Sequence, residues 1–132
     1  MSPLPTVRGG VKFHRWDSVY DTLSESEADK IRKEIGKEIS VEEIETEKLE
    51  FVLDKFLPPN QIIDILNIDA EGCDLEVLKS NNWQKYKPRF VVVEDYGKDI
   101  KELLKSEKFE FFFRLGYRLV SFTCCSYIFS RV

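Results

Sequence analysis

The sequence predicts an α/β fold in which buried parallel strands alternate with helices and an antiparallel pair closes the sheet. Residues 62–69 and 90–95 are short, rich in β-branched residues and nearly continuously apolar, which is typical of strands buried on both faces of a parallel sheet. Each segment ends in acids and is followed by a helical pattern. Residues 117–123 and 126–132 then form two strands around a short turn. This order indicates a sheet with right-handed crossovers and an antiparallel end.

The composition indicates one folded domain. The chain has 132 residues, of which 42% are hydrophobic and 13% aromatic, enough for a core. We expect a flexible lead-in at residues 1–10 and a single domain at 11–132. Residues 1–10 lack the apolar segment of a secretory signal, and no apolar run approaches the ~18 residues of a membrane helix. We therefore expect a cytoplasmic protein with no membrane partner.

The net charge and the cysteine content indicate which partners and which cellular compartment to expect. The formal net charge of −4 argues mildly against nucleic acid as a partner. Three cysteines, two of them adjacent, fit neither a disulfide framework nor zinc-ligand spacing, so a reducing compartment is expected. Cys73, Cys124 and Cys125 are interpreted as packing residues.

The first elements are a strand at 11–16 and a helix that begins at Ser24. Ser24 and Glu27 match a capping box, in which each side chain accepts a hydrogen bond from a free backbone N–H. Gly36 is placed to end this helix. Its apolar stripe is narrow, so the helix is expected at the surface. The residues of the stripe are Ala28, Ile31 and Ile35.

A short strand is expected at 37–45, and Thr46 is expected to cap the next helix. That helix has a full apolar face, and the prolines at 58 and 59 end it. Its apolar positions are Leu49, Val52, Leu53 and Phe56. Later helical patterns cover 74–80 and 100–113, and Gly116 closes the last one.

Acidic residues mark the ends of both buried strands. Asp69 and Glu71 follow the first, and Glu94 and Asp95 end the second. Ligands of open α/β sheets bind beyond the carboxyl ends of the strands, so these carboxylates can meet in one cleft. Such a cluster can bind a metal, accept a proton from a hydroxyl, or hold a cationic or polyhydroxyl ligand. The alternative is that the acids are solvated and interact with helix dipoles.

The other candidate functional residues give weaker indications of a site. His14 is the only histidine, which excludes a metal site with two histidines, and it is expected to be a surface residue. Gly9 and Gly10 do not follow a buried strand, so they do not form a nucleotide-binding loop. No dedicated metal site is expected.

Two runs resemble the FkbM family of S-adenosylmethionine-dependent methyltransferases. They are IDILNIDAEGCDLEVLKSNNW at 63–83 and KYKPRFVVVED at 85–95, and the closing LGYRLVSFTCCSYIFSRV is similar to the final hairpin of the family. The resemblance covers residues 22–132. The positions that match the family pattern are Asp64, Asp69, Glu71, Gly72, Leu75, Glu76, Leu78, Lys79 and Glu94.

The resemblance implies a Rossmann-like class I methyltransferase sheet and transfer of a methyl group to an oxygen of a small-molecule or glycan acceptor, such as a sugar or polyketide-type hydroxyl. It implies catalytic roles for Asp69 and Glu71, either of which would polarise or deprotonate that hydroxyl, directly or through a metal. It also implies contact of Glu94 with the acceptor or an ordered water. The glycine-rich cofactor loop and the ribose-binding acid of such enzymes have no counterpart in this chain. We therefore expect a truncated domain, the C-terminal half of the sheet.

Three hypotheses of function follow: an active methyltransferase whose other half comes from another chain, an inactive remnant or binding module that keeps the acidic cleft, and a structural interaction domain. S-adenosylmethionine is the expected cofactor, although binding by this chain alone is not expected. The strand at 62–69 would become an edge without lysine, proline or a bulge to protect it. We expect self-association, or a covering strand from 11–16 or 37–45.

Overall fold

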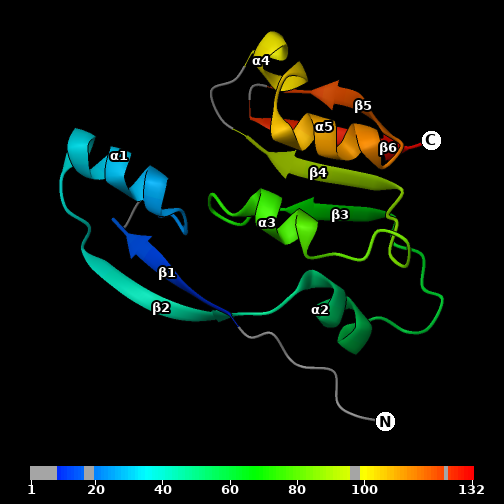
Figure 1. Ribbon diagram of the computed structural model, residues 1–132, viewed down its shortest axis with the longest axis horizontal. Coiled ribbons are helices and arrows are strands. Elements are labelled where there is room, and N and C mark those ends of the chain that lie inside the picture. Colours follow the sequence, from blue (N-terminus) through cyan, green and yellow to red (C-terminus); the bar gives the residue numbers. More distant parts are fainter. Residues whose placement is uncertain (1–8, 17–19, 96–98, 124) are drawn as a thin grey trace.

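The computed structural model describes residues 9–16, 20–95, 99–123 and 125–132. These residues form a mixed α/β structure with a two-stranded and a four-stranded sheet (Figure 1). The expected lead-in lies mostly outside the described residues, and β1 (Gly9–Arg15) begins within it.

The small sheet pairs β1 with β2 (Ser40–Thr46) in antiparallel register, with Val11 opposite Ile44. Both strands were predicted. They pair with each other, so neither covers the edge of the larger sheet. The expectation that one of them would cover this edge is therefore wrong. α1 (Glu25–Ile35) lies between them in sequence and flanks the same sheet in space (Figure 1).

The capping box of α1 forms only in part. The Ser24 hydroxyl accepts a hydrogen bond from the Glu27 backbone N–H at 3.3 Å. The Ser24 backbone N–H donates instead to the Thr22 hydroxyl at 3.1 Å, which leaves Glu27 free to pair with Lys30. Gly36 ends the helix with a φ of 105°, as predicted.

The start of α2 (Leu49–Phe56) differs from the prediction. Thr46 is the last residue of β2, and Lys48 takes the N-cap position without a side-chain hydrogen bond. Leu49 packs against the core, whereas Phe56 is 71% exposed, so the apolar face of the helix is exposed at its end. The helix ends before the two prolines, as predicted.

The larger sheet has the order β3-β4-β6-β5. β3 and β4 are parallel, and β6 is antiparallel to both of its neighbours. The predicted parallel pair followed by an antiparallel hairpin is therefore present. The strands are β3 (Ile65–Ile68), β4 (Phe90–Glu94), β5 (Tyr117–Phe122) and β6 (Ser126–Arg131).

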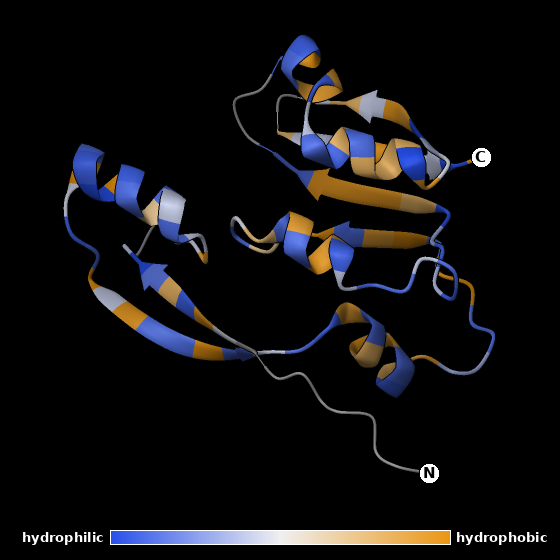
Figure 2. Ribbon diagram, viewed as in Figure 1, coloured by the Kyte–Doolittle hydropathy of each residue, from blue (hydrophilic) through white to orange (hydrophobic). Residues whose placement is uncertain are grey.

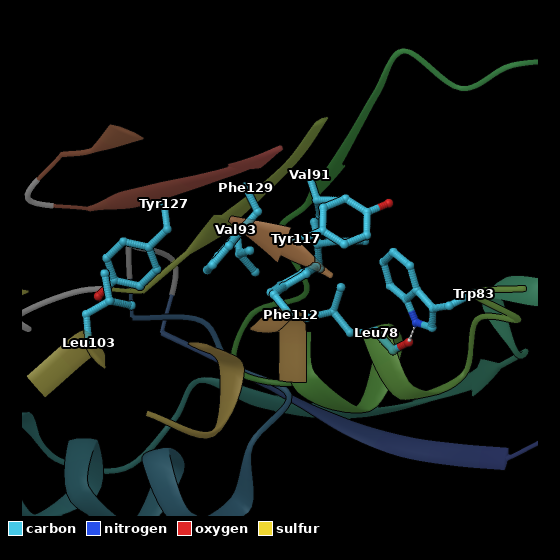
Figure 3. Packing of buried hydrophobic residues seen from close by; sticks show 10 residues of the cluster. Leu78, Trp83, Val91, Val93, Leu103, Phe112, Tyr117, Tyr127 and Phe129 are labelled. Carbon is cyan, nitrogen blue, oxygen red and sulfur yellow. Dashed lines mark hydrogen bonds between the residues drawn. The ribbon is translucent and has the colours of Figure 1, made fainter. Parts of the chain in front are cut away.

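Three helices pack on one face of this sheet: α3 (Asp74–Lys79), α4 (Ile100–Leu104) and α5 (Glu107–Arg114). Aromatic rings fill the space between α5 and the strands (Figure 3). Phe112 stacks on Phe129 with ring centroids 4.2 Å apart, and the Trp83 indole N–H donates to the Leu78 carbonyl at 2.8 Å. Burial of these rings fixes α5 against β5 and β6.

Among the described residues, the opposite face of the sheet is covered only in part, contrary to the prediction of strands buried on both faces. Val91 and Val93 of β4 point into the core, while Phe90 is 38% exposed. Its register partner Ile65 is 64% exposed. β4 is hydrophobic along its length (Figure 2), but the helices that supply the core lie on one side only. β3 is also shorter than predicted and lies at the edge of the sheet.

A helix that crosses a bilayer needs about 18 or more consecutive, predominantly apolar residues. None of the helices in the described part of the chain has both the length and the apolar character required.

Candidate functional site

A cavity of about 810 Å³ lies where β3 and β4 end, opposite α1 and the residues that precede it. Asp69, Glu71 and Glu94, the three predicted site residues, all line it, and so does Asp95. Eight of its described lining residues are Asp or Glu and two are Lys. The structure thus brings the predicted carboxylates to one cavity, while their catalytic roles stay predictions.

The turn after β3 carries two of these carboxylates and is fixed by the opposite wall. Glu71 has a φ of 47° and Gly72 a φ of 95°. The Glu71 carbonyl accepts hydrogen bonds from the Thr22 hydroxyl at 2.9 Å and from the Leu23 N–H at 2.7 Å. The turn is therefore held against the residues before α1.

Glu71 has a perturbed acidity. Its side chain is accessible, yet partial desolvation in the cavity raises its pKa, and the charge of Asp69 adds to this effect. Glu94, Asp21 and Asp74 contribute further in the same direction. A carboxylate with a raised pKa takes a proton more readily near neutral pH.

Asp74 was not singled out from the sequence, where it only begins a helix. It is 7% exposed. Its Oδ1 accepts the Ala70 N–H at 2.6 Å, and its Oδ2 lies 3.6 Å from the Lys108 ammonium. Burial raises the pKa of Asp74, while the Ala70 N–H and Lys108 oppose this rise.

Lys108 was also missed. Residues 100–113 were predicted only as a helical pattern, and nothing local to the sequence links position 108 to the acids. The Lys108 ammonium donates to the Glu94 carbonyl at 3.2 Å and lies 3.9 Å from Asp95 Oδ2. It brings a positive charge from α5 to the ends of both parallel strands.

The wall formed by α1 depends on a buried ionic network around His14. The prediction of a surface histidine is wrong, because His14 is 2% exposed. Its Nδ1 lies 3.2 Å from Glu38 Oε1 and 3.0 Å from an Arg32 guanidinium nitrogen. Hydrogen bonds from Arg32 hold the pKa of Glu38 well below its usual range. The backbone of His14 also pairs with Thr22, which orients the cavity wall.

The arrangement suits acceptance of protons or hydrogen bonds better than thiol chemistry. Burial raises the pKa of Cys73, so its thiol stays protonated near neutral pH. Cys125 is half-buried, and Cys124 lies outside the described residues. Among the residues that the structure describes, no three His, Cys, Asp or Glu side chains group as metal ligands.

Comparison with known protein families identifies a methyl-transfer domain. The sequence profile of the methyltransferase FkbM domain matches residues 10–119. No curated protein and no solved structure matches the chain.

Proposed function

Because the chain belongs to the FkbM methyltransferase family, we propose that its acidic cavity binds a hydroxyl-bearing acceptor for methylation by S-adenosylmethionine. The acceptor class is a small molecule or glycan with sugar-like or polyketide-type hydroxyls. The observation that carries this proposal is the convergence of Asp69, Glu71 and Glu94 on one cavity.

The lining fits one part of the methyl donor. S-adenosylmethionine has a cationic sulfonium centre, and the excess of carboxylates in the cavity favours a cation nearby. The segment between β3 and β4 has a single glycine, at position 72, and the segment between β4 and α4 is not glycine-rich either. We therefore assign to this cavity the acceptor and the charged centre of the donor, and not its nucleoside.

The proposed reaction forms an oxygen–carbon bond, breaks a sulfur–carbon bond and releases the hydroxyl proton. When bound, the donor supplies an electrophilic methyl group. Glu71 accepts the proton, for which its raised pKa suits it better than an ordinary carboxylate. Asp69 accepts a hydrogen bond that orients the hydroxyl, and Glu94 contacts the acceptor or an ordered water. Positioning supplies most of the rate gain, because a carboxylate is a weak base for an alcohol.

A second candidate function is a binding module that keeps the acidic cavity without catalysis. The absence of a glycine-rich segment after β3 and β4 favours it. Such a module would bind the acceptor and transfer no methyl group.

The test is transfer of a labelled methyl group from S-adenosylmethionine to a panel of sugars and polyketide-type alcohols. The protein is expressed as its gene encodes it, with any in-frame sequence upstream of Met1. We expect labelled product, and at least about a hundredfold less with Glu71→Gln. Glu107→Gln, on α5 outside the cavity lining, is the matched control and should keep full activity. Acceptor binding without transfer would favour the binding module.

A further inference from the structure

Lys108 differs from the other lysine that lines the described part of the cavity. Lys30 is 68% exposed and pairs with Glu27 on its own helix at 2.7 Å. Lys108 is 17% exposed, and its ammonium faces groups from two other elements. A lysine that is mostly removed from solvent loses much of its hydration. Its ammonium therefore needs the protein groups that replace water, and it holds those groups in place.

We propose that Lys108 is a positioning residue of the candidate site, which holds the turn after β3 and the end of β4 in the arrangement that brings Glu71 and Glu94 together. This inference rests on the proposed function for its catalytic meaning, but its structural content can be measured separately.

The link to Glu71 passes through Asp74. The Lys108 ammonium lies 3.6 Å from Asp74 Oδ2, and Asp74 Oδ1 accepts the Ala70 N–H at 2.6 Å. Ala70 stands between Asp69 and Glu71 in the turn. When Lys108 holds the Asp74 carboxylate, that carboxylate fixes the backbone of the turn that carries Asp69 and Glu71.

The link to Glu94 is direct. The Lys108 ammonium donates to the Glu94 main-chain carbonyl at 3.2 Å and lies 3.9 Å from the carboxylate of the next residue, Asp95. One cation on α5 thus joins the ends of two parallel strands. It also offsets part of the repulsion among the carboxylates that these ends bring together.

The test compares Lys108→Met, Lys108→Arg and the wild-type protein by nuclear magnetic resonance. In Lys108→Met we expect Asp74 to titrate at higher pH and the Ala70 amide to exchange about tenfold faster, because the carboxylate that holds it is released. Lys108→Arg keeps the charge and should stay near wild type. Lys79→Met, an exposed lysine of α3 whose contact is Glu107, is the matched control and should change neither readout.

Unchanged Asp74 titration and Ala70 exchange in a folded Lys108→Met protein would overturn the proposal. Should that variant not fold, the wild-type protein decides: the Ala70 amide shift and the Lys108 side-chain signals should follow the titration of Asp74, and independence among them would overturn the proposal. Neither readout requires methyl transfer, so failure of the proposed function is recognised separately.

Steady-state kinetics of the variants test the same proposal in a protein that transfers the methyl group. We expect kcat to fall about tenfold in Lys108→Met with KM within about twofold, a shifted pH profile, and recovery in Lys108→Arg. An unchanged kcat and pH profile in Lys108→Met would show that Lys108 does not position the reacting groups.

Discussion

The Thr22 hydroxyl donates a hydrogen bond of 2.9 Å to the main-chain carbonyl of Glu71, across 49 positions of sequence. This bond joins the segment before α1 to the turn after β3. The two walls of the cavity therefore meet at the residue with the proposed catalytic carboxylate. Because Thr22 also pairs with the backbone of buried His14, the small sheet and the site are structurally linked.

Gly72→Ala should destabilise the protein strongly. A Cβ at Gly72 would lie 2.9 Å from the Ser24 Cβ and 3.0 Å from the Thr22 hydroxyl, in a backbone with a φ of 95°. Gly36→Ala is the matched control, since Gly36 has a φ of 105° but no atom within 4 Å of that Cβ. We expect a loss of about 1 kcal/mol for Gly36→Ala and about 2 kcal/mol more for Gly72→Ala, measured by urea unfolding. Equal losses would show that the turn does not pack closely on the opposite wall.

Asp74→Asn should weaken the pH dependence of stability. Burial raises the pKa of Asp74, so the folded protein binds this proton more tightly than the unfolded chain does. The resulting stabilisation is fully present below the ordinary aspartate pKa and is lost as the pH rises through the raised value. Across this range the melting temperature of Asp74→Asn should fall less than that of wild type. Asp64→Asn, at a carboxylate that is 72% exposed, should keep the wild-type slope.

Glu38→Gln should destabilise the protein at neutral pH. Arg32 lowers the pKa of Glu38, so the stabilisation by this carboxylate is present above the ordinary glutamate pKa and is lost as the pH falls through the lowered value. The difference in melting temperature between wild type and Glu38→Gln should therefore shrink in acid. Glu42→Gln removes a 54% exposed carboxylate near Arg15 and should have little effect. Equal melting curves for both variants would argue against the buried network.

The 132-residue chain should bind S-adenosylhomocysteine more weakly than micromolar. The cavity offers carboxylates to the charged part of the ligand, but no glycine-rich segment follows β3 or β4, so most of the nucleoside stays in water. Calorimetric titration measures this directly. A micromolar dissociation constant would show that other residues of the chain complete the binding site.

Self-association should increase with protein concentration. β3 is an edge strand, and its first residue, Ile65, is 64% exposed. Light scattering coupled to size exclusion should give masses above the 15.5 kDa of one chain, and Ile65→Lys should reduce them. Phe113→Lys changes an equally exposed residue on α5 and serves as the control. A constant 15.5 kDa monomer with a cooperative melt would contradict this prediction.

Local patterns predicted most elements because their signals act within a few residues. Ser24 caps α1 and Gly36 ends it, since both effects depend on the adjacent backbone. Thr46 failed as a cap because pairing with Gly9 keeps it in β2. Phe56 and Ile65 were assigned to buried faces on hydrophobicity alone, but burial requires a covering element, which the sequence pattern does not specify.

The sequence allowed prediction only of the site residues that lie at the carboxyl ends of the parallel strands. Asp69 and Glu94 end neighbouring parallel strands, so a shared cavity follows from topology. Lys108 reaches the same place from a helix 14 positions beyond Glu94, through a contact with no local signature. His14 was misjudged for the same reason, because its partners Arg32 and Glu38 come from other parts of the chain.

The distance in sequence between the two cavity walls has a consequence for folding kinetics. The β5–β6 hairpin closes a short loop, whereas the contact between Thr22 and Glu71 must first overcome the closure entropy of a long one. We therefore expect the cavity to assemble after the hairpin. A bound acceptor, which needs both walls, would slow unfolding of the protein and leave its folding rate unchanged.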